Sequence, residues 1–140
     1  MWRLAGALII TVALGVLSRL WETGLFVWDK VLGDALYAVA VYLVVAIGST
    51  VLRRSWTAPV LGGIAVGACW AVEAFQATGW TATSVSSANI RAVLGTTFGF
   101  TDLVWYVIGV AVIALLDVFV LRPGVAYRVD VDGPGPRSDW

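Results

Sequence analysis

The sequence predicts an all-α, polytopic membrane protein, with four transmembrane helices forming one small bundle over residues 1–121. Composition is the first observation: 60% of the 140 residues are hydrophobic and only 13% are charged, which exceeds what a water-soluble domain carries. The second is that the apolar residues gather in four stretches, to be compared with the roughly 20 residues that cross about 30 Å of hydrocarbon. Polar and turn-forming segments separate these stretches, as connections between helices do.

The four predicted spans lie at residues 4–20, 31–52, 59–78 and 102–121. The first follows Arg3, as in a secretory signal peptide, but no A-x-A cleavage pattern precedes Arg19, so we expect an uncleaved helix. Thr57 and Pro59 mark the start of the third span, because a threonine oxygen can cap free N–H groups and proline suits the first turn. Residues 122–140, rich in glycine, proline and charge, are expected to form a mobile tail.

The basic residues predict the orientation, because loops rich in lysine and arginine resist translocation. With four spans, one side would hold Arg3, Arg53, Arg54, Arg122, Arg128 and Arg137. The opposite side would hold only Arg19, Lys30 and Arg91. We therefore expect a multi-pass protein of the cell membrane with both termini in the cytoplasm.

The segment at residues 78–100, between the third and fourth spans, is too polar to cross a membrane and too long for a simple turn. Connections of this length are usually functional. Ser87 and Gly95 can begin and end a short helix, which would lie on the membrane or dip into the outer mouth of the bundle. This lateral helix would carry Arg91 inward.

Several classes of function are disfavoured by composition. Nine basic and nine acidic residues leave no net charge, so no basic surface is expected to bind nucleic acid. The lone cysteine, Cys69, permits neither an intrachain disulfide nor a multi-cysteine metal cluster. The chain has no histidine, the commonest metal ligand and proton shuttle. We therefore expect no metal, no cofactor and no catalytic residues.

Charged and polar residues gather toward the extracytoplasmic ends of the predicted spans. Glu73 and Gln76 share one face of the third span with Cys69, because residues three or four apart are neighbours on a helix. Isolated charges in hydrocarbon cost a few kcal/mol each, so these side chains should face inward and meet one another. The candidate binding residues are Arg19, Asp34, Glu73, Gln76, Arg91, Asp102 and Tyr106.

Other positions bear on packing. Gly109 lies at helical spacing from the polar residues of the fourth span and should let a neighbouring helix approach closely. Gly63 and Gly67 form a small face, expected to pack inside the monomer, with a homo-oligomer contact as the alternative. Asp117 and Arg122 are expected to mark the cytoplasmic boundary and not a site.

The stretches "LGVLSRLW", "KVLGDALYA", "EAFQ" and "FTDLVWYVIG", with an arginine in the third loop, resemble the small bacterial membrane proteins of domain of unknown function 2809. They are similar, more distantly, to VanZ-like proteins. The resemblance covers residues 14–117 and implies a VanZ-like bundle with the candidate binding residues and Gly109 as its polar signature. Tyr106 stands where VanZ-like proteins tend to have asparagine, which weakens a transfer of their role in lowered susceptibility to lipoglycopeptide antibiotics. The nearer family has no established activity.

The favoured hypothesis is non-catalytic binding of an amphiphile or envelope-lipid head group in an outward-facing polar pocket. Arg19 and Arg91 would meet an anionic part of the ligand, and the carboxylates would meet cationic or hydroxyl groups. One alternative is a small proton- or ion-coupled transporter in which Glu73 is the protonation site. A second is an ion-paired plug that only fixes helix register. An enzyme that uses paired acids on a lipid-linked substrate is less favoured. Membrane lipid is the expected partner.

Overall fold

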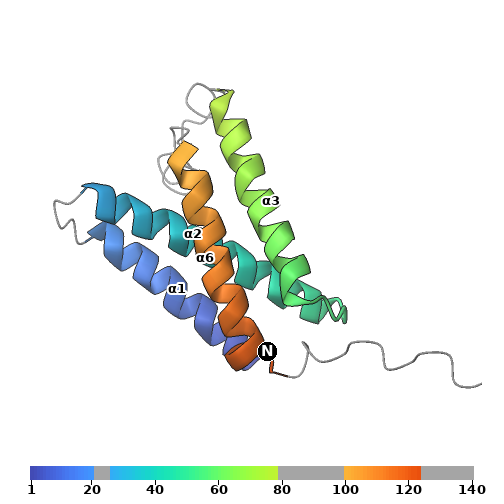
Figure 1. The fold of residues 1–140 in the computed structure, drawn as a ribbon. Coiled ribbons are helices and arrows are strands. Elements are labelled where there is room, and N and C mark those ends of the chain that lie inside the picture. Colours follow the sequence, from blue (N-terminus) through green and yellow to red (C-terminus); the bar gives the residue numbers. More distant parts are fainter. Residues whose placement is uncertain (21–25, 79–99, 124–140) are drawn as a thin grey trace, which may run out of the picture.

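The computed structural model describes residues 1–20, 26–78 and 100–123, and every element in these ranges is helical (Figure 1). The elements are α1 (Trp2–Leu20), α2 (Phe26–Val51), α3 (Ala58–Ala77), α6 (Phe100–Leu116) and η1 (Asp117–Leu121), a π-helical turn that continues α6. The predicted all-α class is confirmed.

Helix α2 lies at the centre of the bundle. It packs against α1, α3 and α6, and α3 also packs against α6. The chain reverses direction between α1 and α2 and again between α3 and α6, and the two pairs cross obliquely (Figure 1). The start of α1 lies beside the end of η1, where the Arg3 guanidinium donates a hydrogen bond of 2.8 Å to the carbonyl oxygen of Val120.

Three helical segments are long and apolar enough to cross a membrane: Val31–Val51, Ala58–Ala77 and Phe100–Leu121. The apolar part of α1, Trp2–Ser18, is shorter. Only 22%, 33% and 28% of the residues in the most apolar windows of the three segments are buried within the chain, so most of their apolar surface faces outward. Contiguous exposed apolar surface of this kind is unfavourable in water and suits a lipid environment.

The bounds of the helices agree closely with the predicted spans, although α2 begins at Phe26, before the predicted start of its span. At the start of α3 Thr57 is the N-cap and has an extended backbone, and Pro59 lies in the first turn, as predicted. The Thr57 side chain, however, makes no capping hydrogen bond. The carbonyl oxygen of Thr57 instead accepts the first helical bond, from the N–H of Leu61 at 3.1 Å.

The buried core lies along α2 and the faces that α3 and α6 turn toward it. Cys69 is 1% exposed and belongs to this core, consistent with a small buried hydrophobic side chain. The other core residues are Leu4, Ala38, Tyr42, Leu43, Ala46, Leu61, Ala65, Tyr106, Val110 and Ile113.

Glycines decide how closely α6 approaches its neighbours. A Cβ atom at Gly109 would lie 2.6 Å from the carbonyl oxygen of Ala35, so the predicted close approach at Gly109 is confirmed. The prediction that Gly63 and Gly67 pack inside the monomer is wrong: both are exposed, and a Cβ on either would meet no atom of the described residues within 4 Å. Gly62 faces α6 instead, because one residue turns a helix by about 100°.

Candidate functional site

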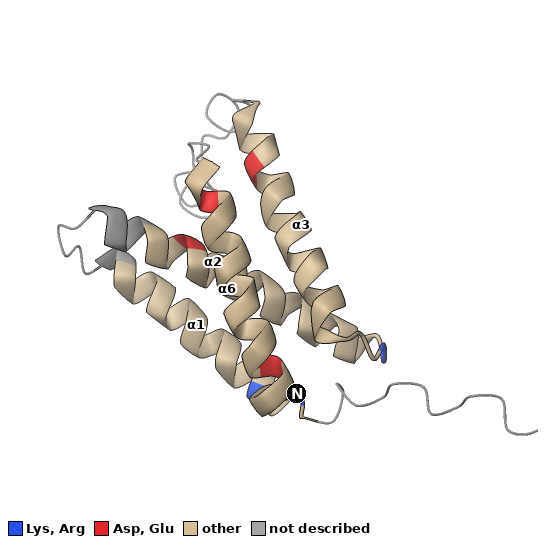
Figure 2. Cartoon of the chain, in the orientation of Figure 1, with Lys and Arg blue, Asp and Glu red and all other residues tan. Residues whose placement is uncertain are grey.

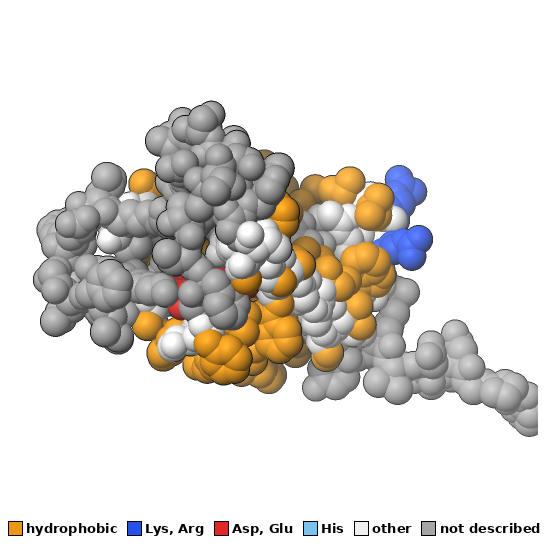
Figure 3. Space-filling view, turned by 90° about the horizontal axis from the view of Figure 1, so that it is seen from above, with side chains coloured by type: hydrophobic (Ala, Val, Ile, Leu, Met, Phe, Trp, Pro, Cys, Tyr) orange, Lys and Arg blue, Asp and Glu red, His pale blue; other side chains and the backbone are white. Residues whose placement is uncertain are grey.

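Acidic positions on α2, α3 and α6 lie toward the same end of the bundle, where α3 ends and α6 begins (Figure 2). Glu73, Gln76 and Asp102 are only 3%, 6% and 4% exposed. The three carboxyl groups of Asp34, Glu73 and Asp102, with Gln76 and Tyr106, are called the acidic cluster below. In the view from above, small areas of acidic side-chain atoms are visible at this end of the molecule (Figure 3). The predicted inward orientation of Glu73, Gln76 and Asp102 is confirmed.

Tyr106 is the residue around which the acidic cluster is arranged. Its hydroxyl donates a hydrogen bond of 2.6 Å to Glu73 Oε1, which joins α6 to α3. The carboxyl groups of Asp34 and Asp102 are also close enough to act electrostatically on this hydroxyl. The Tyr37 ring, one turn after Asp34 on α2, lies 6.1 Å from the Tyr106 ring between centroids, tilted by 55°. Helical spacing on each element thus brings side chains from α2, α3 and α6 to one place.

The second oxygen of Glu73 has a different environment from the first. Glu73 Oε2 is buried and has no hydrogen-bond partner among the described residues. A buried polar atom without a partner is uncommon, because its lost hydration is not replaced. Within the described part of the chain, no group of three or more Cys, Asp or Glu side chains is placed to hold a metal ion. The arrangement therefore offers an acceptor for a hydrogen-bond donor, or a site for a proton.

Some predicted features lie outside the described residues. The backbone of Arg19 belongs to the last turn of α1, but its side chain is not among those described. Arg91 and the predicted lateral helix fall within residues 79–99, and the tail beyond Pro123 is likewise outside the described ranges. The part of the predicted site that would meet an anionic group therefore stays a prediction.

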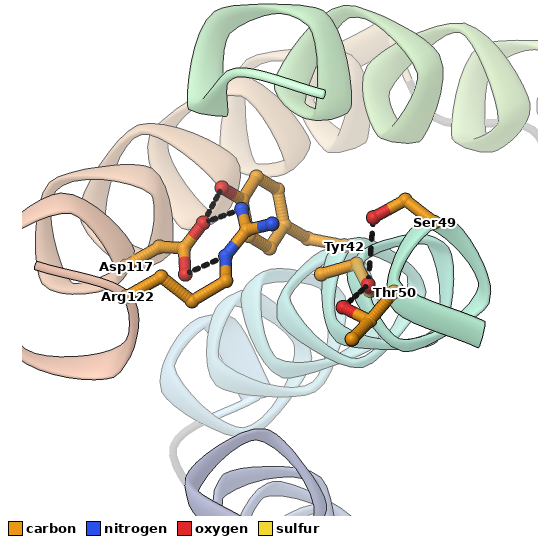
Figure 4. A network of polar contacts seen from close by, with 6 residues as sticks. Tyr42, Ser49, Thr50, Asp117 and Arg122 are labelled. Carbon is orange, nitrogen blue, oxygen red and sulfur yellow. Dashed lines mark hydrogen bonds and ion pairs between the residues drawn. The ribbon is translucent and has the colours of Figure 1, made fainter. Parts of the chain in front are cut away.

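A second polar network, called the inner network below, lies at the other end of α6 (Figure 4). The Tyr42 hydroxyl donates a hydrogen bond of 2.6 Å to Asp117 Oδ2. Arg122 donates from Nε to Asp117 Oδ1 at 2.7 Å and forms an ion pair with Oδ2. Asp117 is 1% exposed and Tyr42 is fully buried. These bonds raise the pKa of the Arg122 guanidinium above its usual value, so the group stays charged.

The expectation that Asp117 and Arg122 only mark a boundary is therefore incomplete, because Asp117 also binds Tyr42 on α2. The π-helical turn explains the pairing with Arg122. The backbone N–H of Arg122 donates to the carbonyl oxygen of Asp117, five residues earlier, at 2.8 Å. This bond brings the Arg122 side chain over the Asp117 carboxylate. Tyr42 was not singled out from the sequence. Its spacing from Asp34 and Ala38 on one face of α2 is the signal that could have found it.

The Tyr106–Glu73 hydrogen bond gives a direct test of the acidic cluster. Tyr106→Phe would leave both Glu73 oxygens without a donor among the described residues, so the free energy of unfolding should fall by about 1–3 kcal/mol. Denaturant unfolding in one detergent measures this. Ser49→Ala is the matched control, since the Ser49 hydroxyl bonds only to the Ala46 carbonyl oxygen of its own helix at 2.8 Å. An equal loss in both variants would contradict a special role for Tyr106.

A family model described as Protein of unknown function (DUF2809) matches residues 25–110. The chain belongs to the DUF2809 family. The DUF2809 match runs from the beginning of α2 to the middle of α6 and includes all five residues of the acidic cluster, whereas Asp117 and Arg122 lie beyond it. No curated protein and no solved structure matches the chain. Membership of DUF2809 confirms the predicted family and assigns no activity, and the likeness to VanZ-like proteins stays a prediction.

Proposed function

We propose that this DUF2809 protein is an integral membrane protein whose acidic cluster, together with Arg19 and Arg91, binds the head group of an amphiphile or envelope lipid without catalysis. The observation that carries this proposal is the buried Glu73 Oε2, which has no hydrogen-bond partner among the described residues. An unmatched buried acceptor costs about 1–3 kcal/mol, and a donor group on a ligand would remove that cost. The aromatic rings of Tyr37 and Tyr106 would line the same site.

The distribution of charge supports an extracytoplasmic position for the acidic cluster. Among the residues whose side chains the structure describes, the basic positions lie toward the opposite end of the bundle (Figure 2). They are Arg3, Arg53, Arg54 and Arg122. Basic residues favour the cytoplasmic side of a membrane, so the proposal places both termini in the cytoplasm and the acidic cluster toward the outside.

The same unmatched oxygen also supports a second candidate, a proton- or ion-coupled transporter in which Glu73 gains and loses a proton. Carboxyl groups inside membrane-spanning helices serve as proton carriers in pumps and transporters. In this candidate the acidic cluster exchanges protons with one side of the membrane. The transporter candidate predicts a proton or ion flux across the membrane, whereas the binding proposal predicts a ligand that stays on the purified protein.

Glu73→Gln tests the proposal, because the amide oxygen can still accept from Tyr106 while the charge is lost. Native mass spectrometry after mild detergent extraction should find a lipid or amphiphile on the wild-type protein. Loss of one charge-assisted hydrogen bond, about 1.5–3 kcal/mol, should lower its occupancy by at least about tenfold in the variant. Ser49→Ala is the control and should retain the ligand.

Three results would contradict the proposal. Equal retention of the lipid or amphiphile by wild type and Glu73→Gln would show that the ligand binds at another site. A Glu73-dependent proton flux in proteoliposomes, without a retained ligand, would favour the transporter. Loss of stability in Glu73→Gln with neither ligand nor flux would leave only the structural plug.

A further inference from the structure

The hydrogen-bonding needs of Glu73 Oε2 restrict the class of head group that the acidic cluster can bind. This inference rests on the proposed function. Glu73 is 3% exposed, its Oε1 is occupied by the Tyr106 hydroxyl, and its Oε2 has no partner among the described residues. A ligand that complements this oxygen must bring an N–H or O–H donor. A group without such a hydrogen would bury the oxygen still further without replacing its lost hydration.

The chemistry of the Glu73 carboxyl group selects among donors. Its Oε1 accepts a hydrogen bond from the neutral Tyr106 hydroxyl, and its Oε2 has no partner among the described residues. Hydrogen bonds from a cationic donor to a carboxylate are shorter and stronger than those from a neutral donor. A cationic nitrogen with attached hydrogens therefore suits this position better than a sugar hydroxyl.

The two aromatic rings favour a cation as well, but they do not choose among ammonium groups. The Tyr37 and Tyr106 rings lie 6.1 Å apart, tilted by 55°, and aromatic ring faces attract primary and quaternary ammonium alike. Only the buried Glu73 Oε2 separates these two, because a trimethylammonium has no N–H to donate. A site with a buried polar atom rejects a ligand that cannot satisfy it more strongly than an apolar pocket rejects a misfit.

We infer that the head group bound by the acidic cluster carries a primary ammonium, as an ethanolamine phospholipid does, and that Glu73 Oε2 accepts a hydrogen bond from it.

The test uses phospholipids that differ only in how many N–H hydrogens of the head-group nitrogen are replaced by methyl groups. The full-length protein is reconstituted in vesicles of phosphatidylglycerol that contain an equal fraction of phosphatidylethanolamine, its N-methyl or N,N-dimethyl derivative, or phosphatidylcholine. Lipid retained after mild extraction is counted by native mass spectrometry. We expect occupancy to fall stepwise along the series and to be at least about tenfold lower for phosphatidylcholine than for phosphatidylethanolamine. Glu73→Gln should flatten the series, and Ser49→Ala should reproduce the wild-type series.

Other outcomes would overturn the inference in distinguishable ways. Equal retention of phosphatidylcholine and phosphatidylethanolamine would assign recognition to the Tyr37 and Tyr106 rings. Preferential retention of phosphatidylglycerol would assign it to an anion site. In both cases, if Glu73→Gln retains less lipid than the wild type, the proposed head-group site is supported and only the inference of a primary ammonium is wrong. If no lipid is retained in a Glu73-dependent manner, both proposals fall together.

Discussion

Gly109→Ala should destabilise the protein by about 1–3 kcal/mol or more, the range for overfilling a well-packed core. The added Cβ would lie 2.6 Å from the carbonyl oxygen of Ala35, 3.1 Å from its Cα and 3.2 Å from its carbonyl carbon. These are backbone atoms of α2, which cannot rotate away as the end of a side chain can. Helices α2 and α6 would have to separate, and Tyr37 and Tyr106 would separate with them.

Two other glycines of the chain provide a graded control for Gly109→Ala. Gly62→Ala would place its Cβ 3.3 Å from Val110 Cγ1, a side-chain atom that can shift, so we expect a smaller loss. The Cβ of Gly63→Ala would meet nothing within 4 Å in the part of the chain that the structure describes, so this variant should change the stability by less than about 0.5 kcal/mol. Thermal unfolding followed by circular dichroism in one detergent would rank the three variants. If Gly109→Ala and Gly63→Ala behave alike, the close approach of α2 and α6 is wrong.

Asp117→Ala should cost about 3–5 kcal/mol, as expected when one partner of a buried ion pair is removed. Asp117 accepts hydrogen bonds from Tyr42 and from Arg122, and the Arg122 side chain is only 13% exposed. Without Asp117, a guanidinium and a buried hydroxyl would both lose their acceptor. The end of η1 would then detach from α2. Unfolding in mixed micelles with increasing denaturing detergent would measure the loss.

Leu115→Ala is the matched control for Asp117→Ala, because Leu115 lies on the same helix and is 61% exposed. It should cost far less in a lipid-like environment. A double-mutant cycle between Asp117→Asn and Arg122→Gln should give a coupling energy of about 0.5–3 kcal/mol, as residues of one network do. Additive losses, or equal costs for Asp117→Ala and Leu115→Ala, would argue against the inner network as a structural tie.

The inward face of α6 bears on the choice between binding and transport. Asp102 and Tyr106 lie at one end of this face and Asp117 at the other, while Gly109, Val110 and Ile113 between them are buried and carry no titratable side chain. On α6, therefore, the acidic cluster and the inner network are separated by an apolar layer. These three residues of α6 offer no titratable group that could pass a proton along this face.

The sequence by itself determined the class of the protein and the positions of its helices. Apolar length and composition predicted the helices now seen as α2, α3 and α6 with η1, because the hydrocarbon thickness sets a minimum length that is visible in the sequence. Helical spacing also predicted that Glu73, Gln76 and Asp102 face inward, because polar groups avoid lipid and the helix period decides which positions share a face.

The tertiary structure alone decided which faces meet and at what distance. One residue of rotation made Gly62, and not Gly63, the glycine that faces α6. The partnership of Tyr42 with Asp117, 75 residues apart, and the choice of Tyr106 as the donor to Glu73 likewise depend on how the helices cross. Crossing angle and rotation result from the packing of all the side chains at an interface, and that sum cannot be read from the period of any single helix.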